Sequence, residues 1–231
     1  MKTPVVDYRE FRLSRLNDPR FSHLKYLLGW VGYFVLYFLT ETFIPAENCY
    51  PVHSVLDDLL PFHEAFVIPY VFCYLLIVIS LVYFALYNTD SFKKLQTYII
   101  VTQVLAMTVY ILFPTRQDLR PTVFPRDNFL TDVVRFLYYF DTNTGVCPSL
   151  HVAYSLGIAS VWVREKGVSL LWKIFVVMAV LLICLSTAMI KQHSVVDAFA
   201  ALPVCLVAEL VTYGKTYLAR LKKGENPSPS Y

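Results

Sequence analysis

Charged residues are scarce in this chain. Only 16% of its 231 residues are Asp, Glu, Lys or Arg, and 57% are hydrophobic, whereas a soluble domain usually carries about 25% charged residues. The composition and the long apolar runs therefore indicate a membrane protein. The net charge of +3 is too small and too scattered to indicate nucleic-acid binding. We expect membrane lipids, and no nucleic acid, as partners.

Signals for a metal cluster and for secretion are also lacking. The five cysteines include no Cys-x-x-Cys pair, so no metal site of that kind is predicted. Cys49 and Cys147 fall on the same expected side of the membrane, which leaves a disulfide between them open. The first 25 residues are polar and charged, so no cleavable signal peptide is expected.

Six apolar segments read as membrane-spanning helices. They lie at Leu24–Ile44, Glu64–Tyr87, Leu95–Pro114, Pro148–Val163, Val168–Met189 and Ser194–Tyr213. The fourth is short for a span, which needs roughly 20 residues. Before it, Asn128–Phe140 carries apolar residues at mixed helical spacing and is expected to lie along the membrane interface. The sequence thus predicts an all-α integral membrane bundle of six transmembrane helices, with an interfacial helix in an outer loop, as one domain over residues 1–231.

Basic residues sort the connections between these segments into two sides. Lys and Arg cluster in the N-terminal tail (1–23), after the second and fourth spans, and in the C-terminal tail (216–231), which is expected to be disordered. The positive-inside rule then places both termini in the cytoplasm of a multi-pass protein of the cell membrane. The loops 45–63, 115–147 and 189–193 face outward. Four arginines break the rule on that side and need a reason beyond topology: Arg116, Arg120, Arg126 and Arg135.

Two histidines stand at the outer ends of predicted spans. His151 begins the fourth span and His193 begins the sixth, and Asp197 follows His193 by four residues, so the last two share one helix face. A carboxylate one turn from an imidazole can fix its tautomer and stabilise its cation. His193 is therefore a candidate nucleophile, and His151 a candidate acid for a leaving oxygen.

An anion is the expected ligand between them. Pro148 and Ser149 suit the first turn of a helix, whose free N–H groups bind anions. Arg120 and Lys191 lie in adjacent outer loops and can neutralise a phosphate. Ionisable residues within membrane spans indicate function by default.

These residues resemble the motifs of the type 2 phosphatidic acid phosphatase superfamily. Pro148–His151 reads Pro-Ser-Leu-His and is similar to its second motif, Pro-Ser-Gly-His. Ser186, His193 and Asp197 have the spacing of its third motif, and Leu119–Pro121 is similar to the end of its first motif. Their order and the six-span pattern cover nearly the whole chain.

The chain departs from the family pattern at two cation positions. Phe113 stands where the first motif has lysine, and Thr187 where the third has arginine, while Leu150 replaces the glycine of the second. Arg116 and Lys191 are the candidates to replace the missing cations. The motifs are closer to the branch that includes inositol phosphorylceramide synthases and sphingomyelin synthases.

The resemblance implies phosphoryl chemistry on a phospholipid or lipid phosphate. It gives His193 the role of a nucleophile that forms a phosphohistidine, His151 that of acid and then base, and Asp197 that of orienting His193. It implies no metal and no cofactor; the adjacent acids Asp57 and Asp58 do not point the same way in most local structures. The leading hypothesis is a lipid phosphate phosphatase at the outer face. The alternative is a phosphotransferase that passes a phosphorylated headgroup to a lipid alcohol.

Each site residue also has a purely structural interpretation. His151 can cap a helix at the interface, His193 with Asp197 can be a structural pair, and Ser149 can be only an N-cap. Lys191 can anchor a helix end, and the arginines can bind lipid headgroups without chemistry. A non-catalytic protein that binds lipid phosphates is therefore the second alternative. His23, in the basic tail, is expected at the surface.

Overall fold

The computed structural model describes residues 3–222, except for the side chain of Arg220. Eight α-helices make up most of this part of the chain. They are α1 Leu28–Phe43, α2 Val55–Leu59, α3 Val67–Tyr87, α4 Thr89–Leu112, α5 Phe129–Phe140, α6 Leu150–Arg164, α7 Leu170–Met189 and α8 Val195–Lys222. Two short strands, β1 Tyr50–Pro51 and β2 Thr115–Arg116, pair in parallel. The fold is helical, as the apolar segments predict.

Four helical segments are long and apolar enough to cross a membrane. They are Glu64–Tyr87, Thr89–Leu112, Leu170–Met189 and Val195–Ala219. The other two predicted spans are also helical but shorter, with 16 residues in α1 and 15 in α6. A 3-10 helix, Ser22–Leu27, leads directly into α1. Within residues 3–222, four of the six predicted spans therefore have the length and composition needed to cross a membrane.

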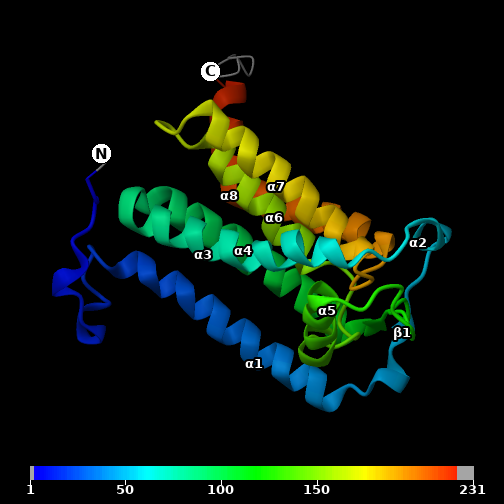
Figure 1. Ribbon diagram of the computed structural model, residues 1–231. Helices are drawn as coiled ribbons and strands as arrows, with labels where there is room; N and C mark the ends of the chain where they lie inside the picture. Colours follow the sequence, from blue (N-terminus) through cyan, green and yellow to red (C-terminus); the bar gives the residue numbers. More distant parts are fainter. Residues whose placement is uncertain (1–2, 223–231) are drawn as a thin grey trace.

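Helix α4 is the centre of the bundle, because α1, α3, α6 and α8 all pack against it. Gly157 of α6 permits one close approach, since a Cβ there would lie 2.5 Å from the ring of Tyr98. Two indoles donate hydrogen bonds between helices of the bundle: Trp162 Nε1 to Ser80 Oγ at 2.9 Å, and Trp30 Nε1 to Gln96 Oε1 at 3.2 Å. Figure 1 shows α6, α7 and α8 side by side, with α1 along the opposite flank.

The connections predicted to face outward gather at one end of the bundle. Figure 1 shows α2, β1 and α5 there, with both chain ends towards the other. Strand β1 joins β2, and Arg116 of β2 also bridges to Thr144, so the start of the connection 115–147 is tied both to its own end and to the connection 45–63. Helix α5 forms where an interfacial helix is predicted and leaves Phe129, Phe136 and Phe140 exposed.

Two expectations for the polar regions are wrong. Residues 216–222 were expected to be disordered, but they continue α8, because they contain neither Gly nor Pro to end a helix; residues 223–231 of that tail lie outside the described part. His23 was expected at the surface but is 2% exposed. Its ring contacts Phe92 edge-on and its Nε2 lies 2.6 Å from Tyr8 Oη. The five cysteines are free thiols.

The burial of His23 predicts acid sensitivity. Burial, and secondarily Lys93, lower the pKa of His23 below its ordinary 6.5. The unfolded chain then binds more protons than the folded chain below that pH, so stability falls as the pH drops from 7.5 to 5. We expect His23→Gln to reduce this slope in thermal-unfolding curves, and His53→Gln, at an exposed histidine, to keep it. Equal slopes in both variants would contradict the assignment.

Candidate functional site

The N-terminus of α8 forms a capping box. Ser194 is the N-cap, because its Oγ accepts from Val196 N at 3.1 Å. Asp197 Oδ2 accepts from Ser194 N at 2.9 Å, which completes the reciprocal pair. Both residues are fully buried. The carboxylate of Asp197 thus caps the N-terminus of α8. It is also available to His193, the residue immediately before the N-cap.

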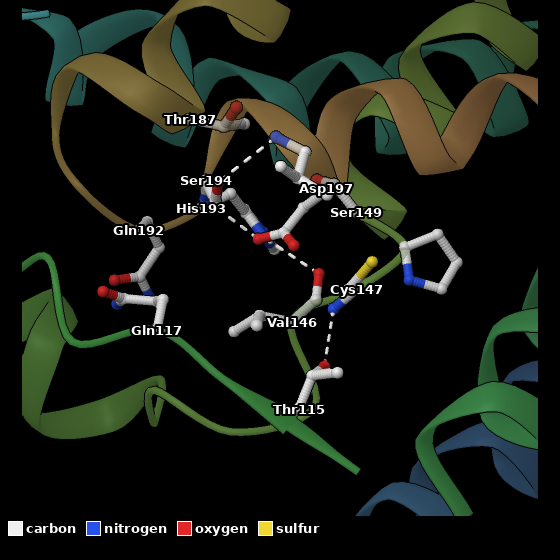
Figure 2. Close-up of polar contacts among 12 residues, drawn as sticks. Thr115, Gln117, Val146, Cys147, Ser149, Thr187, Gln192, His193, Ser194 and Asp197 are labelled. Carbon is white, nitrogen blue, oxygen red and sulfur yellow. Dashed lines mark hydrogen bonds and ion pairs between the residues drawn. The ribbon is translucent and has the colours of Figure 1, made fainter. Parts of the chain in front are cut away.

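His193 is oriented through Nδ1. This atom lies 3.1 Å from the carbonyl oxygen of Val146 and 3.4 Å from Asp197 Oδ2, and Figure 2 shows the imidazole between these two acceptors. A carbonyl oxygen can only accept, so the proton of the neutral ring belongs on Nδ1. Nε2 then carries the free lone pair, which is the form that a nucleophile requires.

His151 lies beside His193 but has different partners. The two ring centroids are 5.8 Å apart. Tyr74 Oη is 3.0 Å from His151 Nε2, and Tyr70 stacks on the imidazole with 4.2 Å between ring centroids. Tyr70 Oη also lies 3.4 Å from His151 Nδ1. His151 is therefore held by phenols, whereas a carboxylate and a carbonyl hold His193.

Sequence reasoning missed the partners of His151. Tyr70 donates to Asp141 Oδ2 at 3.1 Å, so an acid from the loop after α5 connects through a phenol to the second histidine. Tyr70 and Tyr74 are four residues apart on α3, and this spacing is the sequence pattern that could have indicated two phenols on one helix face. They were not singled out among the 17 tyrosines, most of which were attributed to the core and the membrane interface.

Ser149 joins the two histidine-bearing helices. Its Oγ caps α6 by accepting from Val152 N at 3.5 Å. Its N–H donates to the carbonyl oxygen of Asp197 at 3.0 Å. The residue is fully buried. The Ser149 side chain therefore acts as an N-cap, and its N–H fixes the start of α6 against α8.

Among the predicted phosphate-binding cations, Arg120 is the one whose side chain donates to the residue next to His193. Nη2 donates to Gln192 Oε1 at 2.9 Å, and Gln192 precedes His193 in the chain. Further donors reach the carbonyl oxygens of Tyr138, Asp141 and Thr142, and the guanidinium carbon lies 4.4 Å from the centroid of the Tyr138 ring. Burial lowers the pKa of Arg120.

Lys191 and Arg116 point towards the loop 45–63 instead. Lys191 Nζ donates to the carbonyl oxygens of Asp57 at 2.7 Å and Leu60 at 2.6 Å, and burial lowers the pKa of Lys191. Arg116 Nη1 donates to the carbonyls of Ala46 and Cys49. The structure therefore brings His193, His151, Asp197 and Ser149 together with Arg120 nearby, and gives these two cations backbone partners.

The two residues that stand where the resemblance predicts a cation, Phe113 and Thr187, lie in different surroundings. Phe113 is 64% exposed. Thr187 is fully buried, and its carbonyl oxygen accepts the backbone N–H groups of both Gln192 and His193 at 3.0 Å. Thr187 thus shapes the turn before His193 through its main chain.

Cys147 lies next to this turn. Its backbone N–H donates to Thr115 Oγ1 at 3.1 Å, as drawn in Figure 2. Burial and the neighbouring Asp197 raise the pKa of its thiol to about 12. The thiol therefore stays protonated near neutral pH and is a poor nucleophile.

Comparisons with protein-family models, curated proteins and solved structures find no match for this chain. The argument for function therefore rests on the residues and their geometry.

The contacts of Lys191 predict a stability effect. Lys191→Met removes a charged donor from two carbonyl oxygens, and hydrogen bonds to charged groups contribute about 1.5–3 kcal/mol each. We expect the free energy of unfolding in detergent to fall by about 2–4 kcal/mol. Lys94→Met is the control, because Lys94 forms an exposed pair with Asp90 and such pairs contribute about 0–1 kcal/mol. A loss no greater than that of the control would show that the Lys191 contacts are not stabilising.

Proposed function

We propose that the protein cleaves a phosphate ester of a membrane lipid through a phosphohistidine at His193. The observation that supports this most is the pair of imidazoles 5.8 Å apart, one of which has Nδ1 occupied by acceptors. The proposal requires one phosphoryl group to contact both rings, with attack from about 3–3.5 Å. Transfer then needs no covalent partner beyond the nitrogen of His193.

Each step has a residue to perform it. Nε2 of His193 attacks phosphorus, the bond from phosphorus to the lipid oxygen breaks, and protonated His151 gives its proton to that oxygen. Neutral His151 then takes a proton from water, whose oxygen attacks phosphorus as the P–N bond breaks. Asp197 stabilises the positive charge on the phosphorylated ring, and Arg120 is the proposed phosphate contact.

The membrane arrangement belongs to the same proposal. Helices α1 and α6 complete six spans, and α5 lies along the interface with its exposed aromatic side chains in the lipid headgroups. The distribution of Lys and Arg puts both termini in the cytoplasm of the cell and the histidines at the outer face. A lipid phosphate in the outer leaflet is then within reach of the site, and the enzyme is a lipid phosphate phosphatase.

One observation favours a second candidate, a transferase that passes a phosphorylated headgroup to a lipid alcohol. Two of the three cations predicted to contact phosphate, Lys191 and Arg116, donate to backbone carbonyls. A phosphate monoester is close to a dianion at neutral pH, and a buried charge needs matching partners. A phosphodiester carries one charge and suits a site with Arg120 alone.

The test is turnover by the purified full-length protein in mixed micelles. We expect release of phosphate from a lipid phosphate, or formation of a new phospholipid when diacylglycerol or ceramide accompanies a phospholipid. His193→Ala should abolish either product, because it removes the nucleophile, and Asp197→Asn should lower kcat by about a thousandfold or more. A phosphoenzyme stable in base and labile in acid should form in the wild type.

The products separate the candidates. Free phosphate without new lipid supports the phosphatase, and new lipid that requires the added alcohol supports the transferase. Binding of lipid phosphate with no product, and with His193→Ala equal to the wild type, would leave the non-catalytic alternative.

Sidedness is tested by labelling. Asp127 and Asp90 are exposed and lie at opposite ends of the proposed bundle. In intact cells, Asp127→Cys should react with an impermeant thiol reagent and Asp90→Cys only after permeabilisation, because one is outside and the other is cytoplasmic. The wild type, with its native cysteines, gives the background. The reverse pattern would invert the proposed topology.

A further inference from the structure

Two capping boxes meet beside His193. The box of α8 uses Ser194 and Asp197. The box of α2 is built the same way: Ser54 Oγ accepts from Leu56 N, and Asp57 Oδ2 accepts from Ser54 N at 2.8 Å. Helix α2 lies in the outer loop, more than 130 residues earlier in the chain.

The carboxylate of Asp57 joins the two boxes. Oδ2 accepts from the hydroxyl of Ser194 at 2.6 Å, and Oδ1 accepts from Val195 N at 2.8 Å. Asp57 is 2% exposed. One buried anion therefore faces the N-termini of two helices, where the free N–H groups and the helix dipoles favour negative charge.

The same loop also holds the residues on the other side of His193. Lys191 has a positive φ of 54°, a conformation that a non-glycine residue keeps only when its surroundings fix it. Its Nζ is bound by the carbonyl oxygens of Asp57 and Leu60. His193 is thus flanked by two tethers, at Lys191 and at Ser194, and both end on residues 57–60.

We infer that Asp57 is a positioning residue for His193, an inference that rests on the proposed function. Through Ser194 and Val195, Asp57 fixes the backbone from which the imidazole extends towards Val146 and His151. It also keeps Ser194 N–H directed at Asp197. Without this carboxylate, a buried hydroxyl and a buried N–H lose their acceptor, and the turn relaxes away from the attacking geometry.

The experiment compares Asp57→Asn and Ser194→Ala with Asp58→Asn. Asp58 is the matched control, because it is exposed and pairs with His53. A misplacement of about 1 Å costs about a hundredfold in rate, so we expect kcat per folded molecule to fall by about tenfold to a hundredfold in the first two variants. KM should stay within about threefold, since Asp57 touches the nucleophile turn and not the substrate. The double variant should lose little more than either single one.

A second readout needs no activity. The ring signals of His193 are followed by NMR on protein with 13C-labelled histidine, and the missing signals of His193→Ala assign them. Asp57→Asn releases the turn that carries the imidazole, so these signals should shift, while Asp58→Asn leaves them in place. A merely structural contact would change the melting temperature alone.

The outcomes are distinct. If kcat per folded molecule in Asp57→Asn and Ser194→Ala stays within twofold of Asp58→Asn, or if the ring signals of His193 do not shift in Asp57→Asn, Asp57 does not position His193. If the wild type turns over no lipid, the proposed function fails, and the ring signals still decide whether Asp57 positions His193.

Discussion

The candidate site depends on one buried carboxylate at two helix N-termini. The first N–H groups of a helix have no partner within it, and in apolar surroundings each unpaired polar group is costly. Asp57 meets this requirement for α2 and α8 together. Because the N-cap of α8, Ser194, directly follows His193, the contacts that cap the helix also fix the position of the imidazole. Stability and site geometry are therefore parts of the same constraint.

The same region engages two positively charged side chains in contacts with the backbone. Lys191 and Arg116 donate to carbonyl oxygens of the loop 45–63, and Lys191 thereby holds this loop against the turn before α8. Arg120 also binds three carbonyls, but it reaches Gln192 beside His193. A chain that has Phe113 and Thr187 where the resemblance predicts cations, and whose Lys191 and Arg116 donate to its own backbone, presents a site of low positive charge. This charge balance is the physical reason to weigh a phosphodiester substrate against a phosphate monoester.

The sequence predicted the parts of this arrangement that depend on local patterns. The apolar segments became helices because hydropathy and the absence of breakers act along a few turns, and the spacing of His193 and Asp197 placed them on one helix end. The roles of Lys191 and Asp57 were beyond such reasoning, since their contacts span more than 130 residues and depend on how α2 folds over α8. The burial of His23 could not be predicted for the same reason. A basic tail is expected to be solvated, but contacts with Tyr8 and Phe92 enclose the His23 ring.

The different surroundings of the two histidines suit them to different roles in the proposed reaction. A ring that becomes phosphorylated at one nitrogen and keeps a proton on the other is a cation, and it needs an acceptor with negative charge. His193 has Asp197 and the carbonyl of Val146 at Nδ1. His151 has the phenols of Tyr74 and Tyr70, and the carboxylate of Asp141 is linked to it through Tyr70. A neutral environment suits a group that must release its proton to a leaving oxygen and take another from the acceptor. Environment and role therefore agree for both imidazoles, with the charge held at His193 and the proton exchanged at His151.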